Sequence, residues 1–324
     1  MNRPLQDWLE FAGLSAAAAI VRVLSFEQLR PIADALGSLV YWLDPRGRAT
    51  ALANLEAAFP GKYTGLQKRA IARGSYRTFA RTMLELLWAP NLTRESLGEK
   101  ITISGLDDDP SRLDPDRAVI YCCMHSSNFE WLSFITSLWV TPLPVVAQKF
   151  RNPDLGPIFD KLRSVTGNNV IPQERAMVKM LKLLQRGGKF GLLIDLNIRP
   201  SEGAVPIETF GGLLASVTPA HVALAQRTNA LIVPVECQPL SDGRYHIIYH
   251  KAIECPTDAS TQALVQQCWN TLEHGIHSHP ENWLWPYKHW RYKPSRNNER
   301  YPFYANESGA FEEMISNFGD GMKH

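Results

Sequence analysis

Ala118-Val119-Ile120-Tyr121-Cys122-Cys123-Met124, followed at once by His125-Ser126-Ser127-Asn128-Phe129-Glu130, is the stretch that decides the fold of this 324-residue chain. Seven apolar residues in a row predict a strand that is buried on both faces. Residues 128–138 are then expected to form a helix. A buried strand that leads directly into a helix is typical of proteins that pack helices against a sheet.

The alternation of strands and helices continues along the chain. Further strands are expected at 144–147, 190–194, 230–237 and 244–252, and further helices at 154–165, 175–185, 218–227 and 261–276. This order predicts an α/β fold with a mostly parallel central sheet flanked by helices. The last two strands are joined by Ser241-Asp242-Gly243, a turn sequence that favours antiparallel pairing between them.

The first 43 residues differ from the rest because they are apolar without being strand-like. One apolar stretch covers residues 11–26 and a second covers 32–43. Each is short for a helix that crosses a bilayer, so we interpret residues 1–43 as membrane-anchoring helices that lie in or dip into an interface. Trp8 and Trp42 would then sit at the level of the headgroups. The alternative is a pair of helices that pack on a soluble core.

The remaining chain divides into two further parts. Residues 44–304 are predicted to form the main domain, which opens with a helical segment up to about residue 100. Residues 305–324 are polar and contain glycine, so they are expected to form a C-terminal tail.

Composition excludes several classes of protein. Hydrophobic residues make up 45% of the chain, which is enough for a sizeable core and argues against disorder. A formal net charge of +2 gives no support for nucleic acid as a partner. The five cysteines contain no CxxC pair, so neither a zinc ribbon nor a disulfide framework is indicated, and reduced thiols in a cytoplasmic compartment are the simplest interpretation.

His125 follows the carboxyl end of the buried strand, which is where ligands bind in open α/β sheets. Histidine is the side chain best suited to take up a proton near neutral pH. Glu130, five residues later, is placed to reach back to the imidazole, fix its tautomer and stabilise its protonated form. Ser127-x-x-Glu130 also fits a capping box, in which Glu130 satisfies the start of the helix.

His-x4-Glu after an apolar strand resembles the His-x4-Asp/Glu motif of glycerolipid and lipid A acyltransferases. Other elements of that family occur in the same order along the chain. Before the motif stands Asn54-Leu55-x3-Phe59-Pro60. After it come Lys149-x2-Asn152-Pro153 with Arg163 downstream, Asp195 after a strand, Phe210-Gly211 with Thr218, and Pro280-Glu281-x-Trp283-x-Trp285. Over roughly residues 45–293 the chain is most similar to the lipid A late acyltransferases (lauroyl and myristoyl transferases) and their relatives that acylate other glycolipids. The first motif alone is weak, whereas this succession is specific.

The resemblance implies an O-acyltransferase of the glycerolipid acyltransferase type of fold. Such an enzyme moves a fatty acyl chain from a thioester of acyl carrier protein or coenzyme A to a hydroxyl of a glycolipid such as a lipid A precursor. It also implies a place on the cytoplasmic face of a bacterial inner membrane, in lipopolysaccharide biosynthesis. No metal is expected, and no cofactor apart from the thioester as co-substrate.

The resemblance also implies roles for individual residues. His125 is the general base, Glu130 orients it, and Arg163 stabilises the oxyanion, with the backbone N–H groups that open helix 128–138 as the alternative donors. The expected substrate-binding residues share a place in a loop or at the end of a strand: Lys149, Arg151, Asp195, Asn128 and Lys288.

Other functions remain open at this point. The acceptor could be a lysophospholipid, a phosphatidylinositol mannoside or an aminolipid, since Asp195-Leu196-Asn197 departs from the usual family pattern. A non-catalytic lipid-binding protein on the same fold is an alternative of another class, and Cys122 or Cys123 could be a nucleophile. A serine hydrolase is disfavoured because the chain has no Gly-x-Ser-x-Gly.

Overall fold

The computed structural model describes residues 3–108, 114, 116–147, 150–172 and 176–318. Its main sheet has the strand order β1-β9-β8-β2-β5-β3-β4. These strands are β1 (Ile101–Ser104), β2 (Val119–Cys123), β3 (Val145–Ala147), β4 (Val170–Pro172), β5 (Lys189–Leu193), β8 (Leu231–Pro239) and β9 (Tyr245–Tyr249). All neighbours from β8 to β4 run parallel, whereas β9 is antiparallel to β8. The predicted α/β fold with a mostly parallel sheet is confirmed.

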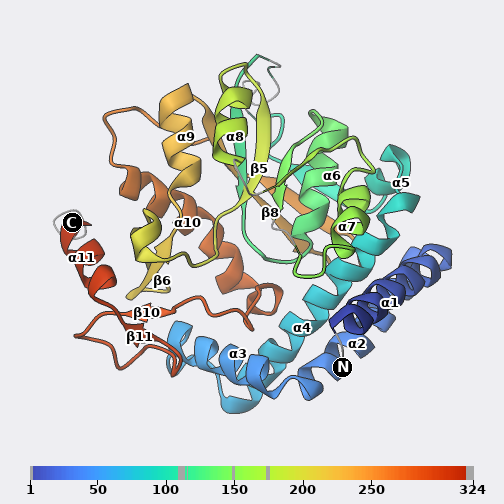
Figure 1. The fold of residues 1–324 in the computed structure, drawn as a ribbon, viewed down its shortest axis with the longest axis horizontal. Helices are drawn as coiled ribbons and strands as arrows, with labels where there is room; N and C mark the ends of the chain where they lie inside the picture. Colours follow the sequence, from blue (N-terminus) through green and yellow to red (C-terminus); the bar gives the residue numbers. More distant parts are fainter. Residues whose placement is uncertain (1–2, 109–113, 115, 148–149, 173–175, 319–324) are drawn as a thin grey trace.

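Helices cover both faces of the sheet (Figure 1). They are α1 (Arg3–Val23), α2 (Phe26–Leu43), α3 (Pro45–Ala58), α4 (Gly65–Trp88), α5 (Arg94–Gly98), α6 (Phe129–Trp139), α7 (Leu155–Arg163), α8 (Ala176–Leu184), α9 (Ala220–Thr228), α10 (Thr261–Ser278) and α11 (Gly309–Phe318). Single 3₁₀ turns are η1 (Ala89–Asn91), η3 (Pro200–Glu202) and η4 (Pro280–Asn282). Outside the main sheet, β6 (Val205–Thr209) and β7 (Leu213–Val217) form a hairpin, and β10 (Tyr292–Lys293) pairs with β11 (Asn306–Glu307).

The central strand β2 explains why the core is split in two. Val119 and Tyr121 belong to a cluster with side chains of α6 and α7, whereas Ile120 and Cys122 belong to a cluster with α8, α9 and α10 on the other face. Successive side chains of a strand point to opposite faces, so an unbroken apolar run fills both clusters. The prediction that the apolar run before His125 forms a strand buried on both faces is therefore confirmed.

The predicted helices and strands between residues 118 and 276 agree with the structure to within a few residues. The antiparallel pairing of the last two predicted strands is confirmed as β8 with β9. Sequence reasoning missed β1, β4, the β6–β7 hairpin and the short pair β10–β11. All of these strands are only two to five residues long, which is too short for an apolar period to stand out.

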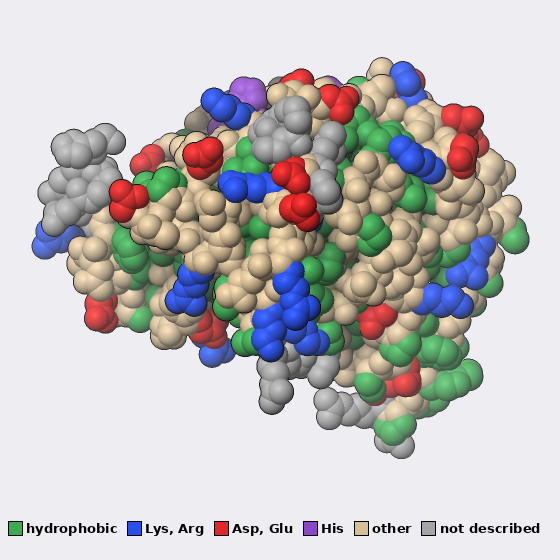
Figure 2. Space-filling model, turned by 90° about the horizontal axis from the view of Figure 1, so that it is seen from above, with side chains coloured by type: hydrophobic (Ala, Val, Ile, Leu, Met, Phe, Trp, Pro, Cys, Tyr) green, Lys and Arg blue, Asp and Glu red, His purple; other side chains and the backbone are tan. Residues whose placement is uncertain are grey.

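The N-terminal helices α1 and α2 lie along α4 at one end of the molecule (Figure 1). Among the described residues, no helix combines the length and apolarity that a bilayer crossing requires. Large apolar side chains are nevertheless exposed on these two helices: Leu5, Trp8, Leu9, Phe11, Ile20, Val23, Leu36, Leu39, Val40, Trp42 and Leu43. We call this set the N-terminal apolar face. In Figure 2 hydrophobic side chains gather at the lower right, on the side where α1 lies in Figure 1.

The segment expected to be a polar tail contains α11 up to residue 318. Phe311 and Met314 of this helix are buried and pack with Ala204. The division of the chain at residues 43 and 304 stays a prediction.

Candidate active site

The register between β2 and β5 brings two predicted site residues together. The two strands are parallel neighbours, and Cys123 pairs with Leu193. Two residues further along each strand, His125 and Asp195 therefore face one another just past the carboxyl edge of the sheet. Asp195 was expected to bind substrate, but the structure places it beside the histidine.

His125 is held by Asp195 at two points. The Nδ1 atom of the ring lies 2.7 Å from Oδ1 of Asp195, and the backbone N–H of His125 donates to Oδ2 at 2.9 Å. Burial disfavours a charged imidazole, but the charge of Asp195 and its hydrogen bond outweigh this, so the pKa of His125 lies above its usual value. Burial alone would raise the pKa of Asp195, yet the charge and hydrogen bond of His125 keep it below its usual range. Asp195 is thus an ionised partner that fixes Nδ1 and leaves Nε2 for a ligand.

Glu130 has a different partner from the one expected. Both of its carboxylate oxygens accept hydrogen bonds from Arg163, from Nε at 3.0 Å and from Nη2 at 2.6 Å. Among the described residues no hydrogen bond joins Glu130 to the ring of His125. The physical reason is geometric, because a carboxylate on the first turn of α6 meets the planar fork of a guanidinium on α7 in a bidentate pair. In this structure Asp195, and not Glu130, hydrogen-bonds the ring of His125, and a role of Glu130 in orienting His125 stays a prediction.

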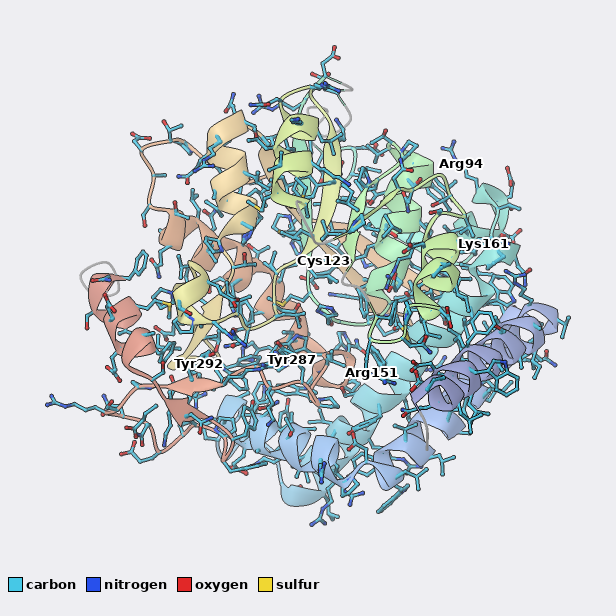
Figure 3. The ribbon with its side chains drawn as sticks, viewed as in Figure 1. Arg94, Cys123, Arg151, Lys161, Tyr287 and Tyr292 are labelled. Carbon is cyan, nitrogen blue, oxygen red and sulfur yellow. The ribbon has the colours of Figure 1, made fainter. Side chains whose placement is uncertain are left out.

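An apolar cavity of about 690 Å³ runs beside these residues. His125, Glu130 and Arg163 form part of its wall. Its other walls come from the sheet (Tyr121, Cys123, Val145, Gly191, Leu193, Val235), from α6 (Phe129, Leu132, Ser133, Thr136) and from α4 and α7 (Phe79, Met83, Phe159). The position of Cys123 is labelled in Figure 3. From His125 back to Tyr121 the cavity follows the strand for roughly 13 Å, at about 3.3 Å per residue.

The loop that carries His125 is pinned from two sides. Ser127 has a φ of 51°, a left-handed conformation that is uncommon for residues other than glycine. Its carbonyl accepts a hydrogen bond from Thr82 of α4 at 2.8 Å, and its N–H donates to Asn282 at 2.8 Å. These contacts fix the sharp turn between β2 and α6.

Asn128 is a structural residue and does not line the cavity. It is only 1% exposed, its Oδ1 accepts from the backbone N–H of Trp131, and its Nδ2 donates to Glu85. Burial raises the pKa of Glu85 to about 7, although the hydroxyl of Tyr245 donates to both of its oxygens. Both ends of the Asn128 amide are therefore used inside the fold, and the predicted contact between Asn128 and substrate stays a prediction.

Of the cations predicted to bind substrate, the two that the structure describes, Arg151 and Lys288, do not line the cavity. Lys149 lies outside the described residues. Arg151 pairs with Glu10 of α1 at 2.8 Å, and it appears between the sheet and α1 in Figure 3. Lys288 is exposed, with Nζ 5.4 Å from the ring centre of Tyr304. Binding of substrate by these three residues stays a prediction.

Sequence reasoning missed the residues behind Asp195. The indole Nε1 of Trp283 donates to Asp195 Oδ2 at 2.9 Å, and the ring of His289 stacks on Trp283 at 3.7 Å between centres. Burial lowers the pKa of His289 to about 4, so this ring is neutral near pH 7. Trp283 stood in the sequence as part of the Pro280-Glu281-x-Trp283-x-Trp285 element, but nothing local linked either residue to Asp195.

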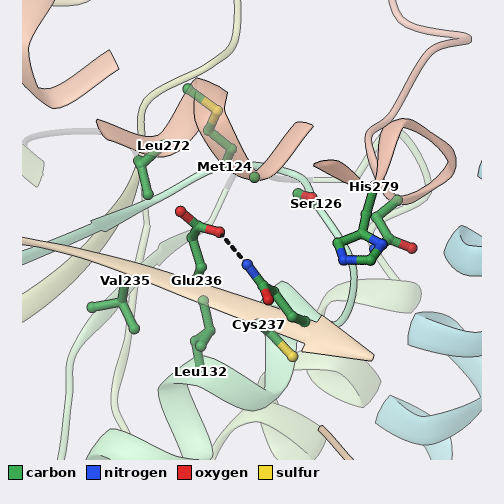
Figure 4. Close-up of a pocket in the computed structure, with 11 residues that line it drawn as sticks. Met124, Ser126, Leu132, Val235, Glu236, Cys237, Leu272 and His279 are labelled. Atoms are coloured by element: carbon green, nitrogen blue, oxygen red, sulfur yellow. Dashed lines mark hydrogen bonds between the residues drawn. The ribbon is translucent and has the colours of Figure 1, made fainter. Parts of the chain in front are cut away.

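Three other candidate sites have less support. A second cavity, shown in Figure 4 between Met124, Glu236 and His279, has a volume of about 20 Å³, which is room for one water molecule. No group of three or more His, Cys, Asp or Glu side chains in the described part of the chain is arranged to hold a metal ion. Cys123 lines the main cavity, but burial raises the pKa of its thiol, which argues against a nucleophile.

Comparison with known proteins settles the family. The model of a family described as bacterial lipid A biosynthesis acyltransferase matches residues 2–292. This chain belongs to that family. It is a lipid O-acyltransferase, of the lipid A type or a related one.

The individual relatives of this acyltransferase are distant. A phosphatidylinositol mannoside acyltransferase of Mycolicibacterium smegmatis is 25% identical over 222 residues, which cover 66% of this chain and 70% of the relative. Lipid A biosynthesis acyltransferase 2 of Shigella flexneri is 20% identical over 278 residues, covering 84% and 86%. The crystal structure of the 1-acyl-sn-glycerophosphate acyltransferase PlsC from Thermotoga maritima gives a TM-score of 0.39 at 15% identity, over 78% of this chain and 99% of that one. A TM-score this low does not establish a shared fold.

Proposed function

We propose that this acyltransferase moves a fatty acyl chain from an acyl thioester to a hydroxyl of a glycolipid, with His125 as general base and Asp195 as its partner. The observation that carries the proposal is the hydrogen-bonded pair of His125 and Asp195 in the wall of a large apolar cavity. A base held in one tautomer beside room for an acyl chain suits this chemistry.

The reaction follows from which atoms are free. Nδ1 of His125 is engaged by Asp195, so Nε2 takes the proton of the acceptor hydroxyl. The hydroxyl oxygen attacks the thioester carbonyl and forms a C–O bond. When the tetrahedral intermediate collapses, the C–S bond breaks, and the imidazolium returns its proton to the leaving thiolate. Asp195 stabilises the imidazolium in between.

Arg163 is our candidate for stabilising the oxyanion. Glu130 engages its Nε and Nη2 and so fixes the guanidinium in the cavity wall. Its side chain is still 18% exposed, so part of the guanidinium can meet a ligand. Glu130 would thus serve the reaction by positioning Arg163, since a fixed donor needs no reorganisation when charge develops.

The cavity fits the acyl chain. Its volume of about 690 Å³ lies within the usual range for ligand pockets, and hydrophobic side chains form most of its wall. We propose a lipid A precursor as the acceptor. A mannosylated phosphoinositide is the second candidate, because the relative from Mycolicibacterium smegmatis carries that name. Either acyl carrier protein or coenzyme A would supply the thioester.

We further propose that the N-terminal apolar face rests on the cytoplasmic surface of a bacterial inner membrane. On α1 its members include Leu5, Trp8 and Leu9, and on α2 they include Leu36 and Val40. Spacings of three and four residues put such side chains on one side of a helix. An apolar stripe of this kind, without a spanning segment, suits a helix lying in the interface.

Mass spectrometry of total lipids tests the proposal. Cells would express the wild type, His125→Ala, or His246→Ala as a matched control, since His246 hydrogen-bonds Ser104 away from the cavity. We expect one lipid to gain an acyl chain with the wild type and the control, and not with His125→Ala. Equal acylation by His125→Ala would contradict the assignment of the base.

A further inference from the structure

We propose that Trp283 is a positioning residue for this reaction, because its indole N–H holds Asp195 in the orientation in which Asp195 hydrogen-bonds the ring of His125. The inference rests on the function proposed above. It concerns a residue that is fully buried and is not among those lining the cavity, so it would act through Asp195 and not through contact with substrate.

Three donors fix the plane of the Asp195 carboxylate. Oδ1 binds the His125 ring, whereas Oδ2 accepts the backbone N–H of His125 and the indole N–H of Trp283, both at 2.9 Å. Two of the three come from His125 itself, so they move with it. Trp283 supplies the one that anchors the pair to another part of the fold.

The backbone around Trp283 is joined to the histidine loop as well. Ser126 and Trp283 form an antiparallel bridge, and the N–H of Leu284 donates to the carbonyl of His125 at 3.1 Å. On the other side of the bridge, Ser127 donates to Asn282. Residues 282–284 therefore set the position of the base through its backbone while the indole sets its partner carboxylate.

The indole ring has little freedom to turn. His289 stacks on one side of it at 3.7 Å with an interplanar angle of 20°, and Trp285 lies edge-on at 4.8 Å. His289 is itself tied to the carbonyl of Leu284 at 2.9 Å. A donor held this tightly in a dry surrounding orients a charged acceptor more strongly than a mobile one.

A pair of matched substitutions separates positioning from packing. Trp283→Phe removes the N–H and keeps an aromatic ring. Trp285→Phe does the same two residues away, at an equally buried tryptophan whose Nε1 donates to the carbonyl of Pro280. Both variants are assayed as full-length protein for acyl transfer over a range of pH, with and without Asp195→Asn.

We expect Trp283→Phe to lower kcat on the order of 10- to 100-fold with KM unchanged, as for loss of a hydrogen bond to a charged group. The negative charge of Asp195 would then act more fully on His125, so the acid limb of kcat/KM moves to higher pH. In the Asp195→Asn background the substitution should cost nothing further. Equal losses in both tryptophan variants with no movement of the acid limb would overturn the inference.

A measurement on the unaltered tryptophan guards against a variant that fails to fold. In wild type with ¹⁵N-labelled tryptophan, one indole N–H signal should follow the titration of His125 and lose this response in Asp195→Asn. If no indole signal responds, Trp283 does not sense the pair and the inference is wrong. The proposed function fails separately, if the wild type transfers no acyl group or if Asp195→Asn keeps its full rate.

Discussion

The two sides of His125 differ in how they are packed. Towards the cavity of about 690 Å³ lie Glu130 and Arg163, a charged pair in which the side chain of Arg163 is 18% exposed. Behind the ring lie Asp195 and Trp283, which are 2% and 0% exposed. In the proposed reaction the acyl chain and the acceptor hydroxyl enter on the open side, which has room for them. The closed side is buried and would set the tautomer and direction of His125 before the reaction, as a general base requires.

The difference teaches how to assign the two carboxylates. Both lie close enough to His125 for their charges to raise its pKa, and Asp195 acts more strongly than Glu130. Only Asp195 hydrogen-bonds the ring. Both carboxylate oxygens of Glu130 instead accept hydrogen bonds from Arg163. A substitution on either side should therefore have its own kinetic signature.

The largest effect on the open side is expected at Arg163. Arg163→Met should lower kcat on the order of 10²–10³-fold, as for loss of one oxyanion donor. Arg244→Met is the matched control, since Arg244 pairs with Asp242 at 2.8 Å and neither residue lines the cavity. Steady-state kinetics with a purified acyl thioester would measure both. If Arg163→Met retains most of its kcat, the backbone N–H groups at the start of α6 become the better oxyanion donors.

The depth of the open side should set the length of the acyl chain. Gly191 of β5 forms part of the cavity wall, and a Cβ added there would lie 3.1 Å from Leu143, which lines the cavity too. Gly191→Leu should shift transfer towards shorter chains, by about 10-fold or more between lengths that differ by several methylenes. A series of acyl thioesters would measure this preference.

Two further variants sharpen that prediction. Leu143→Ala enlarges the same end of the cavity and should favour longer chains. Gly156→Leu is the control, because a Cβ added at Gly156 meets nothing within 4 Å. An unchanged preference in Gly191→Leu would place the end of the acyl chain elsewhere.

The smallest effect is expected outside the active site, on the N-terminal apolar face. The double substitution Trp8→Ser and Trp42→Ser should weaken binding to anionic liposomes several-fold, since each tryptophan would bury apolar surface in the membrane interface. The rate of acyl transfer to a detergent-solubilised acceptor should stay unchanged. Phe303→Ser is the control, because Phe303 is 73% exposed but does not belong to the N-terminal apolar face. Sedimentation with liposomes measures the binding. Equal loss in the control would refute a specific role for this face.

Much of the fold was predictable because its signal is local. The apolar run before His125 is long enough to specify a strand buried on both faces, and the alternation that follows specifies the layers. The same signal put His125 and Asp195 at the ends of two strands. It did not predict that these strands are neighbours, because the hydrophobic period of a strand does not determine its place in the sheet.

The site was harder to predict for the same reason. Glu130 is close to His125 in sequence, which favoured it as the partner of the base, whereas Asp195 is 70 residues away. Trp283 is further still and stood out only as part of the Pro280-Glu281-x-Trp283-x-Trp285 element of the family. The partners of His125 depend on the register of β2 with β5 and on the path of residues 282–284, and both are properties of the tertiary structure.

The most direct test of the account is the pH dependence of kcat/KM for acyl transfer by wild type, Asp195→Asn and Glu130→Gln. His125 must be neutral to accept a proton, so the rate falls as pH drops through its pKa. We predict that the acid limb of the wild type lies above the usual pKa of histidine, because the charge and hydrogen bond of Asp195 outweigh burial. Asp195→Asn should move the limb to clearly lower pH and cost on the order of 10²–10⁴-fold in rate, and Glu130→Gln should move the limb much less. If Glu130→Gln moves the limb further than Asp195→Asn does, Asp195 is not the partner of the base and the account is wrong.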